Sequence, residues 1–81
     1  MDVQHDAEQQ RFVLELEVDE AVLEYQWLSD NSVNFSRTYV PFHARGKGYA
    51  EELVRVGLGW AKQQQLSVAA SCWYVKQHLE S

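Results

Sequence analysis

The sequence changes character within a single stretch, TYVPFHARGKGYA, which runs from Thr38 to Ala50. Before it, apolar and polar residues alternate, which is typical of a half-buried strand. After it, apolar residues recur with the spacing of an amphipathic helix. Between the two lies a short basic loop in which Arg45 and Lys47 alternate with Gly46 and Gly48. The stretch therefore predicts a strand, a glycine loop and the start of a helix, in that order.

Three strands are predicted upstream of the loop. Apolar residues alternate with polar ones over residues 11–18 and again over residues 21–27, and the short break between these segments indicates a hairpin. The third strand covers residues 33–40 and must end at Pro41, which has no N–H to donate to a neighbouring strand. Residues 1–10 are polar, and we expect a flexible N-terminus there.

Two helices and a short strand are predicted downstream. The first helix has one apolar stripe, formed by Tyr49, Leu53, Val56, Gly57, Trp60 and Ala61. Residues 66–70 are apolar without alternation, which indicates a strand buried on both faces or a central strand beside a helix. A last helix begins near Ser71, a residue suited to its N-cap. The pattern predicts an α+β fold of order βββαβα, with a mixed, mostly antiparallel sheet and two helices packed on it.

Length, charge and cysteine content restrict the class of protein. The chain has 81 residues, which suffices for one domain, expected over residues 11–81. Its formal net charge of −5 opposes a phosphate backbone, so we expect no nucleic-acid partner. A single cysteine excludes an internal disulfide and a multi-cysteine metal site. No apolar run or signal sequence is present, which favours a cytoplasmic protein without a membrane partner.

The loop that opens the first helix has the chemistry of an anion site. The first N–H groups of a helix lack intrahelical partners, and the helix dipole adds partial positive charge there. Gly46 and Gly48 allow the backbone to approach a ligand closely, and Arg45 and Lys47 add charge nearby. In a second interpretation, the glycines only shape a tight turn and the two cations are solvated. The motifs of nucleotide-triphosphate loops and dinucleotide folds do not occur.

Three motifs give the chain a family resemblance. The segment RGKGYA at residues 45–50 matches the R/Q-x-x-G-x-G/A signature of the GNAT superfamily of acyl-CoA-dependent N-acetyltransferases. With TYVP at residues 38–41 and CWYV at residues 72–75, the chain resembles the small single-domain GNAT-like proteins. Their patterns are T-x-V-P, R-G-x-G-x-A and C-x-[FY]-V, and they contain little more than the acetyl-CoA-binding half of the full fold. The resemblance covers roughly residues 11–79.

The resemblance implies a substrate and a binding site. Acetyl-CoA would be the acetyl donor and an unidentified amine the acceptor, in an N-acetyltransferase reaction. Tyr39 and Val40 would lie on the strand whose edge pairs with the pantetheine arm of coenzyme A. The pyrophosphate would be bound by the backbone of Arg45, Gly46, Lys47, Gly48, Tyr49 and Ala50. A non-catalytic CoA-binding or protein-interaction module on the same fold stays open as the alternative, and a homodimer stays open as well.

Cys72 and Tyr74 are the catalytic candidates. Cys72 matches the cysteine of the small-GNAT pattern, to which a nucleophilic or proton-transfer role is attached, and a position at a helix start would lower its pKa. A small core residue is the alternative. Tyr74 would protonate the leaving thiolate, or else pack in the core. Family members often carry a histidine where this chain has Arg37, and Glu24 is a further candidate base. We expect His5, His43 and His78 at the surface.

Overall fold

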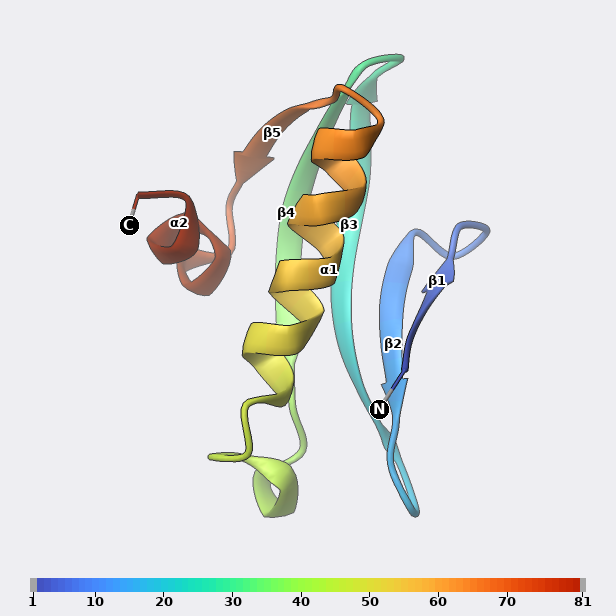
Figure 1. Ribbon diagram of the computed structural model, residues 1–81, viewed down its shortest axis with the longest axis vertical. Coiled ribbons are helices and arrows are strands. Elements are labelled where there is room, and N and C mark those ends of the chain that lie inside the picture. The colour runs from blue at the N-terminus through green and yellow to red at the C-terminus, as the bar shows by residue number, and fades with distance from the viewer. Residues whose placement is uncertain (1, 81) are drawn as a thin grey trace.

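A computed structural model describes the backbone of residues 2–80, and the side chains of all of these except Glu80. One five-stranded sheet carries two α-helices (Figure 1). Its elements are β1 (Val3–Asp6), β2 (Arg11–Glu15), β3 (Glu20–Ser29), β4 (Ser32–Tyr39), the 3-10 helix η1 (Phe42–Ala44), α1 (Tyr49–Gln63), β5 (Ser67–Ala70) and α2 (Trp73–Glu80). The predicted α+β class with a mostly antiparallel sheet is confirmed.

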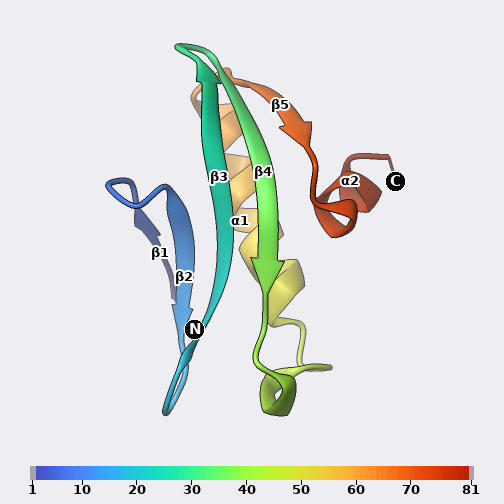
Figure 2. The ribbon, with the colours of Figure 1, turned by 180° about the vertical axis from the view of Figure 1, so that it is seen from behind.

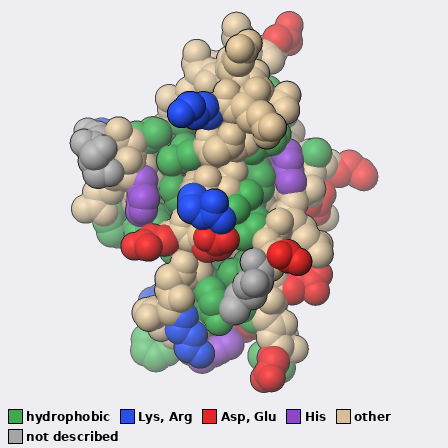
Figure 3. Space-filling model, viewed as in Figure 1, with side chains coloured by type: hydrophobic (Ala, Val, Ile, Leu, Met, Phe, Trp, Pro, Cys, Tyr) green, Lys and Arg blue, Asp and Glu red, His purple; other side chains and the backbone are tan. Residues whose placement is uncertain are grey.

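The strands follow one another across the sheet in chain order. All neighbours are antiparallel except β4 and β5, which run parallel. Helix α1 crosses one face of the sheet, and α2 lies at the edge of the sheet, next to β5 (Figure 1). The opposite face of β2, β3 and β4 carries neither helix (Figure 2). Acidic and basic side chains are interspersed over the face that carries α1 (Figure 3).

The core lies between α1 and the sheet. Phe12, Leu23 and Phe35 of the sheet are fully buried, and α1 meets them at Gly57. A Cβ atom at Gly57 would lie 2.7 Å from Leu23 Cδ2 and 3.2 Å from Phe35 Cε1, so the missing side chain is what allows this close approach. Val54 is also fully buried, although the predicted apolar stripe did not include it.

The predicted element order began at Arg11 and therefore missed β1. This strand is short and pairs with β2, from Val3 opposite Leu14 to Asp6 opposite Arg11. His5 is exposed, as predicted, but its ring also makes specific contacts. Its ring stacks on Phe12 with centroids 4.2 Å apart, and its Nε2 lies 2.6 Å from the Tyr25 hydroxyl. Side-chain contacts of His5 thus add to the backbone pairing of a strand whose sequence is mostly polar.

Strand β5 is an edge strand, which corrects the prediction of a central or doubly buried one. Its residues alternate between exposed and half-buried, because only one of its faces meets the core. It pairs with β4 only from Ser32 to Phe35. The Cys72 N–H donates to the Phe35 carbonyl at 3.2 Å, just beyond the last paired residue of β5. Past this point the two chain segments diverge (Figure 1).

A β-bulge in β4 reverses the orientation of its second half. Tyr25 pairs with Phe35 but Glu24 pairs with Arg37, so Ser36 is an extra residue in β4. Since paired residues share a face, Phe35 lies with Tyr25 on the side of α1, whereas Arg37 lies with Glu24 on the open side. Thr38, the next residue, therefore returns to the side of α1. The bulge decides which side chains of β4 face the helices.

Candidate functional site

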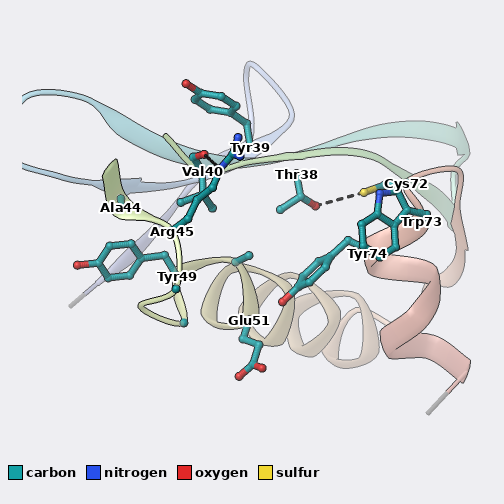
Figure 4. A pocket seen from close by; sticks show the side chains of 13 residues that line it. Thr38, Tyr39, Val40, Ala44, Arg45, Tyr49, Glu51, Cys72, Trp73 and Tyr74 are labelled. Carbon is teal, nitrogen blue, oxygen red and sulfur yellow. Dashed lines mark hydrogen bonds between the residues drawn. The ribbon is translucent and has the colours of Figure 1, made fainter. Parts of the chain in front are cut away.

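A cavity of about 600 Å³ opens where β4 and β5 diverge. It extends from the glycine loop before α1 to the start of α2 (Figure 4). Its lining consists of Thr38, Tyr39, Val40, Ala44, Arg45, Gly46, Gly48, Tyr49, Ala50, Glu51, Cys72, Trp73 and Tyr74. The fold thus brings together every predicted site residue except Lys47, which is exposed and outside the lining.

The glycine loop has a backbone that only glycine adopts readily. Gly46 and Gly48 both have a φ angle of +81°, in the left-handed region. A Cβ at either position would meet no atom within 4 Å, so the space beside the loop is open. The Gly48 carbonyl accepts the Glu52 N–H at 3.1 Å, which makes Gly48 the N-cap of α1. Because Gly48 has no side chain to cap the helix, the N–H groups of the first turn of α1 are available to bind a ligand in the cavity.

Contacts within the chain fix the loop at both ends. Arg45 donates through Nε to the Val40 carbonyl at 3.1 Å, and its guanidinium lies 5.6 Å from the centre of the Phe42 ring. His43 Nε2 is hydrogen-bonded to the Asp19 carboxylate at 2.8 Å. Arg45 and His43 therefore act first as supports of the loop. A ligand with negative charge would meet backbone amides before it meets a free cation.

The end of β4 forms one wall of the cavity. Beyond Phe35 it has no pairing with β5, so its outer edge from residue 36 onward faces the cavity without a strand partner among the described residues. Val40 contributes its side chain to this wall, whereas the Tyr39 ring points to the opposite side of the sheet (Figure 4). That ring lies under the Arg37 guanidinium, 5.2 Å from it.

Cys72 lies half-buried at the far end of the cavity, directly before α2. Its Sγ is 3.4 Å from the Thr38 hydroxyl. Burial raises the pKa of the thiol, but hydrogen bonds from the Thr38 hydroxyl and from the backbone of Val75 and Tyr74 outweigh burial and lower the pKa below that of an ordinary cysteine. The arrangement increases the fraction of thiolate, the reactive form, relative to an ordinary cysteine.

Tyr74 points into the cavity from the first turn of α2 (Figure 4). Burial raises the pKa of its hydroxyl, and the negative charge of Glu51 raises this pKa further. Tyr74 is therefore protonated at neutral pH and can donate a proton or a hydrogen bond. Trp73 forms the rim of the cavity and is largely exposed.

Comparison with known proteins identifies the family. A family model described as GCN5-related N-acetyl-transferase matches residues 11–81. The chain belongs to the GCN5-related N-acetyltransferase family.

Relatives within this family agree over most of the chain. Protein NATD1 of Gallus gallus is 30% identical over 80 residues, which span 96% of this chain and 73% of that protein. Protein NATD1 of Homo sapiens is also 30% identical, over 96% of this chain and 71% of the human protein. The NMR structure of a GCN5-like protein from Staphylococcus aureus matches with a TM-score of 0.70 and 20% identity, covering 98% of this chain and 78% of that one, which supports the fold.

This member of the family has no histidine among the described residues that line its cavity. His43 is paired with Asp19, and His78 donates through Nδ1 to the Tyr74 carbonyl at 3.1 Å. Glu24, considered as a base, lies on the open side of the sheet in an ion pair with Arg37 at 3.0 Å. The cavity therefore differs from a cysteine–histidine site.

Sequence reasoning missed two features of this family member's cavity. Glu51 belongs to none of the motifs in the sequence, yet it lines the cavity one turn from the glycine loop, and its charge raises the pKa of Tyr74. The side chain of Thr38 was not singled out, because alternation without a bulge places it opposite the core.

No helix within residues 2–80 has the length and apolar character needed to span a membrane.

Proposed function

We propose that the chain transfers the acetyl group of acetyl-CoA to an amine. One observation carries the proposal: a single cavity joins a glycine loop at one helix start to an activated cysteine at another. The family supports acetyl transfer as the reaction. The identity of the donor, the acceptor class and the roles of the residues below belong to the proposal.

The loop is suited to the coenzyme pyrophosphate. Backbone N–H groups from Gly46 to Ala50 would hold the phosphate oxygens at the positive end of the α1 dipole, whereas the Arg45 N–H donates to the Phe42 carbonyl at 3.2 Å. Gly46 and Gly48 fit this group because open space lies where their side chains would be. Lys47 would add charge from the surface. Main-chain binding of this kind explains how an acidic protein can hold an anion.

The free edge of β4 is suited to the pantetheine arm. An extended chain with amide groups can add to an unpaired strand edge through main-chain hydrogen bonds. Here the segment from residue 36 to Val40 offers such an edge, between the loop and Cys72. Backbone groups of Tyr39 and Val40 would pair with the arm, which would direct the thioester toward Cys72.

Cys72 and Tyr74 would carry the chemistry. The Cys72 thiolate attacks the acetyl carbonyl carbon, a bond forms between Sγ and that carbon, and the bond from the carbon to the coenzyme sulfur breaks. Tyr74 gives its proton to the departing sulfur. The acceptor amine then takes the acetyl group from Cys72, which recovers its electron pair, and the amine proton passes to the Tyr74 phenolate. Both residues thus return to their starting states.

Two measurements test the proposal. Calorimetric titration with acetyl-CoA should show binding, and binding should persist in Cys72→Ala, because the cysteine is not part of the pyrophosphate site. Mass spectrometry after incubation with acetyl-CoA should show one acetyl group on Cys72, absent in Cys72→Ala. Failure to bind acetyl-CoA would overturn the proposal. Binding without acetyl transfer would instead identify a non-catalytic CoA-binding module.

A further inference from the structure

The cavity contains a cysteine without a histidine to deprotonate it. All three histidines have other partners: His5 the Tyr25 hydroxyl, His43 the Asp19 carboxylate and His78 the Tyr74 carbonyl. None of them is among the described residues that line the cavity. A reactive thiolate at Cys72 must therefore be stabilised by something other than an imidazolium.

The Thr38 hydroxyl is the side-chain group bonded to the sulfur. Its Oγ1 lies 3.4 Å from Cys72 Sγ, and Figure 4 shows the two side chains directed toward each other at one end of the cavity. A hydroxyl can donate to a thiolate, whereas a thiolate can only accept. Deprotonation of Cys72 thus fixes the direction of this hydrogen bond and strengthens it, since hydrogen bonds to ionised groups are the strong ones.

The bulge at Ser36 is what brings Thr38 to this position. In a regular strand of the same sequence, without a bulge, Thr38 would share a face with Asn34, away from the helices. With it, Thr38 pairs with the fully buried Leu23 and lies on the side of α1. The contact with Cys72 therefore depends on a defined irregularity of β4.

The charges around the sulfur do not supply the missing cation. Besides Cys72, the titratable and charged residues that line the cavity are Arg45 from the loop, Tyr49 and Glu51 from α1, Tyr74 from α2, and Tyr39 from β4, whose ring points to the opposite side of the sheet. Arg45 is bonded to the Val40 carbonyl, and Glu51 is itself negative. The Thr38 hydroxyl and the backbone N–H groups at the start of α2 are therefore the groups that stabilise the thiolate.

We propose that Thr38 is a positioning residue that donates a hydrogen bond to the Cys72 thiolate and, with the N–H groups at the start of α2, replaces a histidine in activating it. This inference deepens the proposed function. Its test uses no acetyl-CoA, so its failure and the failure of the proposed function are distinguishable.

The test is the pH dependence of alkylation of Cys72 by iodoacetamide. Thr38→Val keeps the shape of the side chain and removes the donor, whereas Thr38→Ser keeps the donor. Thr38→Val should shift the profile to higher pH. If the loss of the donor makes the thiolate fraction of Cys72 at neutral pH tenfold smaller, the more basic sulfur would be about threefold more nucleophilic, which recovers part of the lost alkylation rate. We therefore expect alkylation about threefold slower at neutral pH and about threefold faster at the alkaline plateau.

The crossing of the two profiles separates donation from a change in structure. A loosened cavity would expose Cys72 and accelerate alkylation at every pH, without a crossing. Thr38→Ser should restore the profile of the parent protein. Ser36→Ala is the matched control, because that hydroxyl bonds to the Glu24 carbonyl and not to Cys72. Profiles of Thr38→Val and the parent that coincide, or that differ by one factor at all pH values, would overturn the inference.

Discussion

Replacement of Gly57 by alanine should destabilise the fold, although alanine is the better helix former. The intrinsic helix preference of alanine over glycine is about 1 kcal/mol. The new methyl group, however, would lie 2.7 Å from Leu23 Cδ2 and 3.2 Å from Phe35 Cε1. Both neighbours are fully buried, so neither can move aside freely. Overpacking of this kind costs about 1–3 kcal/mol.

The expected net effect of Gly57→Ala is a loss of about 1 kcal/mol in the free energy of unfolding. In a domain of this size, that loss lowers Tm by about 4–8 °C. Urea and thermal unfolding, followed by circular dichroism, measure both quantities.

Gly59→Ala provides the matched control in the same helix. A Cβ at Gly59 meets no atom within 4 Å, so the variant should gain about 1 kcal/mol in the free energy of unfolding and a correspondingly higher Tm. The two substitutions are chemically identical and should act in opposite directions. If Gly57→Ala stabilised the protein as much as Gly59→Ala does, the close approach of α1 to the sheet would be refuted.

Three further predictions concern the site and the N-terminal strand. Gly48→Val should weaken acetyl-CoA binding in calorimetry about tenfold or more, because a β-branched residue is strained at φ +81°, whereas unaltered affinity would remove the loop from the proposed site. Saturating acetyl-CoA should protect Cys72 from iodoacetamide, and equal alkylation with and without it would place the ligand elsewhere. Burial lowers the pKa of His5 more than the charge of Asp6 raises it, so the fold favours neutral His5, and the free energy of unfolding should fall as pH drops below about 6.5. His5→Phe should show less of this acid dependence in urea titrations, and an identical dependence would contradict the assignment.

The loop and the elements around it were predictable because their signals are local. Pro41 ends a strand. Gly46 and Gly48 alternate with basic residues, and apolar residues with helical spacing follow them. The order of strand, loop and helix therefore follows from neighbouring residues. The positions of Gly46 and Gly48 at positive φ agree with the residue type. The resemblance to small GNAT-like proteins predicted that Cys72 lies near the coenzyme site. The spacing of residues along the chain does not show this by itself.

What escaped prediction depends on contacts between distant residues. Strand β1 has little apolar content, and it lies beside β2 through backbone pairing and the stacking of His5 on Phe12. The edge position of β5 depends on where β4 lies, which a run of apolar residues does not reveal. The contact of Thr38 with Cys72 depends on the extra residue at Ser36, because alternation alone assigns Thr38 to the wrong face.

The extra residue in β4 has a consequence for how the chain tolerates changes of length. Up to Phe35 the odd-numbered side chains of this strand face the helices, and from Arg37 onward the even-numbered ones do. Deletion of Ser36 would therefore leave a regular strand in which Arg37 and Thr38 keep their faces. Deletion of one residue from the paired segments on either side of the bulge would instead exchange inward and outward side chains beyond that point. The chain should tolerate the loss of one residue at Ser36 better than the loss of one residue within those paired segments.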